Sequence, residues 1–79
     1  MSPRTSMRLS DVPVGTRVRI RHLTSSPGVS QRLREMGFCE NAVVRCVTKG
    51  YGNIICEVFD TRVGLNRGLA GEIVVSKFE

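Results

Sequence analysis

The side chains with the most reactive chemistry in this sequence are three cysteines and one histidine, His22. The spacing of Cys39, Cys46 and Cys56 matches no zinc-binding or redox pattern, and a secreted disulfide framework would use an even number. Cys46 and Cys56 are in phase with neighbouring valines and isoleucines, which predicts buried and unreactive thiols. The alternative is a soft metal site formed by His22 with one or two cysteines, of which Cys39 is the more exposed candidate.

Patterns typical of enzymes are absent from the sequence. No Ser/His/Asp set and no carboxylate pair stands out by spacing, and the phosphate-binding pattern G-x-x-x-x-G-K-[ST] does not occur. The glycine-rich stretch "GLNRGLAG" lacks the lysine of that pattern, so its glycines are interpreted as allowing tight turns. We therefore expect no catalytic residue, no cofactor and no enzymatic activity.

Positive charge is the other feature with chemical consequences. Twelve lysines and arginines against seven acidic residues give a net charge of +5, which favours nucleic acid, a membrane face or an acidic protein surface as partner. Arg17, Arg19 and Arg21 form a stripe that is either a solvated face or a partner-binding surface. Nucleic acid is the less favoured partner because base stacking needs aromatic side chains among the charges. Only Tyr51 and three phenylalanines are aromatic, and we expect the phenylalanines in the core.

The arginine stripe lies on a segment, residues 16–23, whose residues alternate as those of a half-buried strand do. Val18 and Ile20, and by the same parity His22, are predicted on the side opposite the arginines. Further strands are predicted at residues 42–49, 54–60, 61–65 and 73–78. A glycine-rich hairpin turn at residues 50–53 puts Tyr51 at its tip.

A short helix is predicted between the first two strands, starting at Pro27. Val29, Leu33 and Met36 form one apolar stripe along it. Gly37 stands where a glycine in the left-handed conformation ends a helix, and a strand begins soon after it. Near the C-terminus, "NRGLAGE" is too short and glycine-rich for more than one helical turn.

These elements predict one mainly β domain over residues 9–79, preceded by a flexible tail, residues 1–8. The expected architecture is a small SH3-like barrel of five antiparallel strands with one short helix inserted after the first strand. Closure of the barrel would remove the free edges of the sheet. No apolar segment is long enough for a signal peptide or a membrane span, so we expect a cytoplasmic protein without direct membrane insertion.

The stretches "RLREMGF", "AVVRCV" and "CEVFDTRVGLNRGLAGEIVV", with the lead-in "LSDVPVGTRVRI", resemble the ferrous iron transport protein A (FeoA) family. The resemblance covers about residues 9 to 78, and it is the ordered combination of motifs that is specific. The positions that carry it are Arg32, Leu33, Met36, Gly37, Phe38, Cys56, Val58, Val63, Gly64, Leu65, Ala70, Ile73 and Val75. Two departures are Glu40-Asn41, where the family usually has Pro-Gly, and the short loop "KGYGN", where many members have a longer segment.

The resemblance implies a small cytosolic accessory protein of bacterial ferrous iron uptake that binds its membrane permease, FeoB, which has a cytosolic GTPase domain. It also implies structural roles for Gly37, Leu33, Met36, Leu65, Ala70 and Ile73. Arg17, Arg19, Arg21 and Tyr51 are the candidate partner-binding residues. A nucleic-acid-binding barrel and a metal-binding accessory protein, with His22 and Cys39 as ligands, remain the alternatives. The module also resembles the C-terminal domain of metal-dependent repressors of the diphtheria toxin repressor type.

Overall fold

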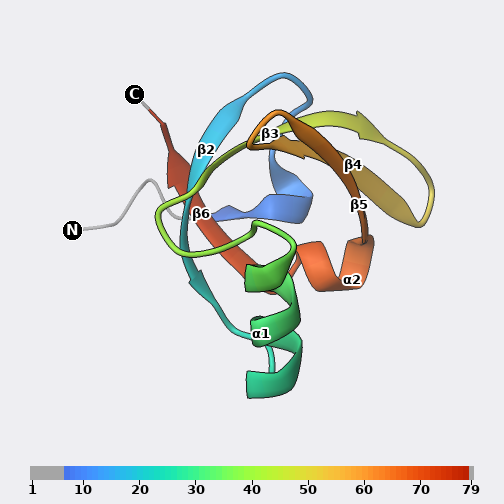
Figure 1. Ribbon diagram of the computed structural model, residues 1–79. Coiled ribbons are helices and arrows are strands. Elements are labelled where there is room, and N and C mark those ends of the chain that lie inside the picture. Colours follow the sequence, from blue (N-terminus) through green and yellow to red (C-terminus); the bar gives the residue numbers. More distant parts are fainter. Residues whose placement is uncertain (1–6, 79) are drawn as a thin grey trace.

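The computed structural model describes residues 7–78, which form six strands and three short helical segments (Figure 1). In chain order these are β1 (Met7–Arg8), the 3-10 helix η1 (Leu9–Asp11), β2 (Arg17–Leu23), α1 (Pro27–Glu35), β3 (Val43–Lys49), β4 (Asn53–Val58), β5 (Thr61–Asn66), α2 (Arg67–Ala70) and β6 (Ile73–Lys77). The protein is mainly β, and its longest helix is inserted between β2 and β3, as predicted. The helix near the C-terminus is a single turn, also as predicted.

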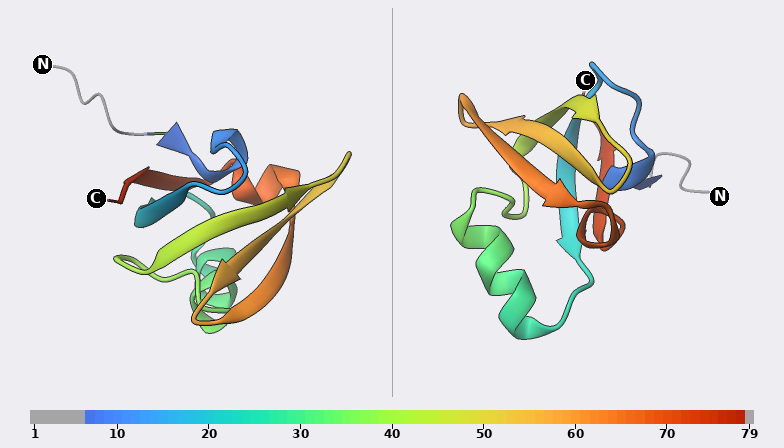
Figure 2. Two further views of the ribbon diagram at one scale, coloured as in Figure 1. Left: turned by 90° about the horizontal axis from the view of Figure 1, so that it is seen from above. Right: turned by 90° about the vertical axis from the view of Figure 1, so that its right-hand side faces the viewer.

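The strands form one antiparallel sheet in the order β1-β6-β2-β3-β4-β5, which curls around the core (Figure 2). The prediction of five strands was wrong, because β1 adds a sixth. Met7 and Arg8, which were expected in the flexible tail, pair with Val75 and Val74 of β6. The remainder of that expected tail, residues 1–6, lies outside the described residues. Within residues 7–78, β1 and β5 end the strand order without pairing with each other.

The core fills the inner face of the curled sheet, and alternation predicted its members well. The fully or almost fully buried strand residues are Val18, Ile20, Val44, Cys46, Ile54, Cys56, Val58, Leu65, Ile73 and Val75. The alternation fails in the second half of β2, where the register with β6 shifts between Ile20 and His22. Because of this irregularity His22 is exposed, so its predicted inward parity was wrong. Of the three phenylalanines only Phe38 is fully buried, contrary to expectation.

Helix α1 ends by the glycine mechanism that the sequence predicts. Gly37 has a φ of +107°, and its N–H donates to the carbonyl of Arg34 at 3.0 Å. The N–H of Phe38 donates back to the carbonyl of Leu33 at 2.9 Å, which completes a Schellman motif. Leu33 and Phe38 are both buried, so the same two residues also supply the apolar contact of this motif. Met36 was expected on the apolar stripe, but it is 40% exposed because the helix has ended there.

The sequence predicted one of the two hairpin turns of the sheet but not the other. The turn at residues 50–53 forms as predicted, with the N–H of Gly50 donating to the carbonyl of Asn53 at 2.8 Å, but without positive φ angles. The turn between β4 and β5 consists of Phe59 and Asp60, with φ angles of +51° and +64°. These angles define a type I′ turn made without glycine or asparagine, which the sequence did not suggest.

Candidate functional site

Arg17, Arg19 and Arg21, called the arginine surface below, lie on the outer side of β2 beside β6. The guanidinium carbons of Arg17 and Arg19 lie 5.6 and 5.2 Å from the centre of the Phe78 ring. Both distances are within the range of attraction between a cation and an aromatic face. The Nε of Arg21 donates to the Oγ of Ser76 at 2.8 Å. Strand β6 and the residue that follows it therefore hold these arginines in place through neutral groups.

Within residues 7–78, no acidic side chain forms an ion pair with the arginine surface. In the part of the chain that the structure describes there are two ion pairs, Arg34 with Glu40 and Arg45 with Glu57, and neither involves this surface. Arg19 uses its Nη1 to donate to the backbone carbonyl of Asn41 at 3.0 Å, which is again a neutral acceptor. The arginine surface is thus a fixed group of three positive charges that an anionic partner could neutralise.

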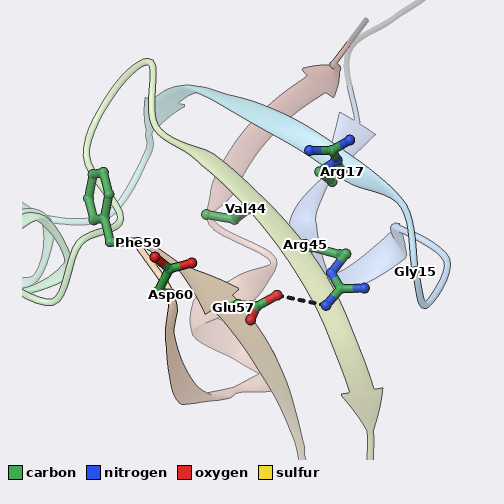
Figure 3. A pocket seen from close by; sticks show the side chains of 7 residues that line it. All are labelled: Gly15, Arg17, Val44, Arg45, Glu57, Phe59 and Asp60. Atoms are coloured by element: carbon green, nitrogen blue, oxygen red, sulfur yellow. Dashed lines mark hydrogen bonds and ion pairs between the residues drawn. The ribbon is translucent and has the colours of Figure 1, made fainter.

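A row of charged residues crosses the outer face of the sheet from the arginine surface. The strand register places Arg17 beside Arg45, Arg45 beside Glu57, and Glu57 beside Arg62. Arg45 donates to Glu57 at 2.6 Å, and this hydrogen bond holds the pKa of Glu57 below its ordinary value (Figure 3). The hollow around this pair is lined by Gly15, Arg17, Val44, Arg45, Glu57, Phe59 and Asp60. Its chemistry is electrostatic, and it combines no nucleophile with a general base.

Cys46 and Cys56 lie in the core, whereas His22 is exposed and Cys39 is partly buried near the end of α1. Cys46 and Cys56 are buried and face each other across β3 and β4, which confirms their predicted burial. Burial, and secondarily the charge of Cys46, raises the pKa of Cys56 to about 12, so its thiol stays protonated at neutral pH. Cys39 is partly buried, and its Sγ lies 3.8 Å from the carbonyl of Gly37. Within residues 7–78, no three His, Cys, Asp or Glu side chains gather closely enough to hold a metal ion.

Three of the six exposed large apolar residues within residues 7–78 lie in β4 or at the two hairpin tips. Tyr51 is fully exposed at the tip of the β3–β4 hairpin, where the sequence placed it. Phe59 is 71% exposed and Ile55 is 36% exposed, and sequence reasoning missed both as surface features. The signal was present, because both alternate with the buried residues Ile54, Cys56 and Val58 along β4. Of the predicted structural residues, Leu33, Leu65, Ala70 and Ile73 are buried.

The protein is thus a mainly β domain, a small curled antiparallel sheet with short helices and the arginine surface on its outer side. Residues 7–77 match the FeoA domain family, so the chain belongs to that family. Its members are SH3-like accessory proteins of ferrous iron transport without enzymatic activity. No curated protein sequence matches the chain significantly.

Solved structures agree with this assignment. An iron uptake regulatory protein (FeoA) is 26% identical, with a TM-score of 0.83 over 92% of this chain and 97% of that chain. FeoA of Stenotrophomonas maltophilia complexed with zinc, an SH3 domain protein, is 30% identical, with a TM-score of 0.78 over 89% of both chains. A manganese-dependent transcriptional repressor shares the fold at 15% identity and a TM-score of 0.86, over 99% of this chain and 38% of its own. Among the described residues, no helix has the length and apolar composition needed to cross a membrane.

Proposed function

We propose that this chain is an accessory protein of ferrous iron uptake that binds the cytosolic GTPase domain of a FeoB-type permease. The observation that carries the proposal is the match of residues 7–77 to the FeoA domain family. The Stenotrophomonas maltophilia relative supports it, since that protein has been proposed as a ferrous iron transport activating factor. In this account the chain works on the cytoplasmic side of the membrane and acts by protein–protein interaction.

The arginine surface is our candidate for the first contact with the permease domain. None of its three arginines forms an ion pair within residues 7–78, so an acidic surface would gain attraction without first breaking one. Phe78 and Ser76 hold the guanidinium groups, which lowers the entropy lost on binding. At physiological salt such charges act over about 8 Å, and they mainly accelerate association.

Tyr51 is our candidate for an anchor that slows dissociation. The whole side chain is exposed at the tip of the β3–β4 hairpin, away from the core. A tyrosine loses little conformational entropy when it inserts into a pocket, and aromatic residues of this kind often dominate binding energy. Removal of this side chain should therefore affect the dissociation rate more than the association rate.

The test is the association rate with the purified cytosolic domain of the cognate permease, measured by surface plasmon resonance at two salt concentrations. Wild type is compared with a variant in which Arg17, Arg19 and Arg21 are serine and with a matched variant in which all three are lysine. The serine variant should associate more slowly and with a weaker salt dependence, whereas the lysine variant retains the charge and should remain fast. Equal rates at low salt for wild type and the serine variant would show that the arginine surface is only a solvated face.

The binding measurement also tests the proposed function itself. Wild type should bind the permease domain saturably, and Tyr51→Ala should dissociate faster than wild type. If the wild-type chain shows no binding to the cognate domain at either salt concentration, the proposed function is wrong. Thermal melts of every variant separate a change in binding from a loss of folding, since Arg21 and Ser76 share a hydrogen bond.

A further inference from the structure

The two ends of the sheet are very different as strand edges. At one end β1 has only two residues, whereas β5 at the other end has six (Figure 2). All six residues of β5 pair with β4 without a register shift, in contrast to the pairings of β2 with β6 and of β3 with β4. β5 contains no proline, and within residues 7–78 no strand pairs with its outer side. Proteins often blunt such an edge with a bulge, a proline or a paired strand, and within residues 7–78 β5 has none of these.

The turn before β5 determines which of its backbone groups face outward. A two-residue turn is flanked by a hydrogen-bonded pair, here Val58 and Thr61, and such pairs alternate with non-bonded ones along an antiparallel ladder. Val63 and Leu65 therefore also direct their N–H and C=O groups toward β4. The groups of the alternate residues, Arg62 and Gly64, point to the free edge.

Two residues next to this edge, Gly64 and Arg62, are accessible to an added strand. Gly64 lies beside Ile55, and a Cβ atom added to Gly64 would meet nothing within 4 Å, so Ile55 is left 36% exposed. Arg62 lies beside Glu57 and helps to lower its pKa through its charge, but the hydrogen bond from Arg45 at 2.6 Å has the larger effect. Arg62 forms no ion pair within residues 7–78. A strand added to β5 would place one residue beside Arg62 and another, two positions away, beside Gly64.

We propose that β5 binds an extended segment of the partner protein as an additional strand. The segment carries an acidic residue beside Arg62 and a large apolar residue beside Gly64, two positions apart. The apolar residue fills the open space over Gly64 and covers Ile55, while the acidic residue continues the alternating charges of the row Arg45, Glu57 and Arg62. An acidic segment also suits the net charge of +5, which disfavours a second copy of this chain. The proposal rests on the proposed function, because the partner is taken to be the permease's cytosolic domain.

The experiment measures binding of that domain by two matched variants at Gly64. Gly64→Pro removes the outward N–H, whereas Gly64→Ala retains it and adds a methyl group in open space. Proline is tolerated at a strand position whose N–H faces away from the sheet. Gly64→Ala keeps the hydrogen bond but narrows the space over Gly64, so it should bind only slightly more weakly than wild type. Gly64→Pro should bind about tenfold more weakly than wild type, through the lost hydrogen bond and the bulk of the ring.

Hydrogen exchange keeps the proposal testable even if Gly64→Pro folds poorly. In free wild-type protein the amides of Arg62 and Gly64 should exchange fast, and binding of the permease domain should protect both. If wild type binds but these amides stay unprotected, β5 is not the binding edge and the proposal is wrong, while the proposed function stands. If wild type does not bind at all, the proposed function fails first.

The other molecule that could pair with the edge of β5 is a second copy of this chain. Light scattering of the free protein at increasing concentration should show a monomer for both wild type and Gly64→Pro. A wild-type dimer that Gly64→Pro abolishes would show that β5 pairs with itself, and it would overturn the assignment of this edge to an acidic partner segment.

Discussion

Two of the segments in which the backbone enters the left-handed region differ in their residues. The segment that ends helix α1 uses Gly37 and Asn41, with φ angles of +107° and +75°. The turn between β4 and β5 uses Phe59 and Asp60, with φ angles of +51° and +64°. Glycine and asparagine adopt this conformation at low cost, whereas a bulky residue such as phenylalanine does so rarely. The residues of the first segment therefore suit a stable fold, whereas Phe59 at positive φ lowers stability.

The two segments also differ in how they are held. An ion pair between Arg34 and Glu40, at 2.9 Å, connects the last turn of α1 to the segment that follows Gly37. The β4–β5 turn has only a weak local bond, from the Oγ1 of Thr61 to the carbonyl of Phe59 at 3.4 Å. The turn is held by the regular pairing of β4 with β5 and not by its own residues. A strained residue that is also exposed, next to a free strand edge, is typical of a functional segment.

The largest expected effect is at Gly37. Gly37→Val should lower the free energy of unfolding by roughly 2 kcal/mol or more, because valine is strained at positive φ. Its Cβ would also lie 3.3 Å from the Cγ1 of Val58. Thermal melts and urea titration measure the change. The control is Gly28→Ala within α1, where an added Cβ meets nothing within 4 Å and stability should rise. Equal stability of Gly37→Val and wild type would mean that the Schellman motif contributes nothing.

A smaller effect of opposite sign is expected at the β4–β5 turn. Replacement of Phe59 by Asn together with Asp60 by Gly supplies the preferred residues of a type I′ turn, and it should raise the free energy of unfolding by about 1 kcal/mol. Asp60→Gly alone is the control and should give part of the gain. A lower melting temperature of the double variant would show that the ring of Phe59, which lies over Gly37, contributes more by packing than it costs in strain.

The smallest effect is the dependence of stability on pH around Glu40. The hydrogen bond from Arg34 lowers the pKa of Glu40 from 4.5 to about 2. Because the folded-state pKa is below the unfolded one, ionised Glu40 contributes stability above pH 4.5, and this contribution is lost as the pH falls toward 2. Glu40→Gln should show a flatter stability profile in this range, measured by melts at successive pH values. Glu35→Gln, which removes an exposed carboxylate outside both ion pairs, is the matched control.

The end of α1 and the β4–β5 turn also show how far the sequence predicts the fold. The end of α1 was predictable because a glycine follows an apolar stripe, and a local hydrogen-bond motif needs nothing more. The Phe59–Asp60 turn was not, because pairing between two strands imposes a conformation that these residues do not prefer. The two-residue strand β1 is too short for any periodic signal. His22 was misplaced because a register shift against β6, a partner distant in the sequence, interrupts the alternation of β2.

The candidate surfaces were predictable to a similar degree. Alternation placed Arg17, Arg19 and Arg21 on one outer face, but their contacts with Phe78 and Ser76 depend on the pairing of β2 with β6. The open edge at β5 was missed because the expected barrel closure would have left no edge. Which strands meet is decided by packing of the whole sheet, and alternation within one strand carries no information about it.

The most direct test of the account is a titration of isotope-labelled chain with the unlabelled cytosolic domain of its cognate permease, followed by two-dimensional NMR. The account predicts a saturable change whose largest amide shifts fall on β2 around Arg19, at the hairpin tip around Tyr51, and on the outward positions of β5, Arg62 and Gly64. Helix α2 and the exposed face of α1 should change little. An absence of any shift at saturating concentrations of the domain, or shifts confined to the two helices, would contradict it.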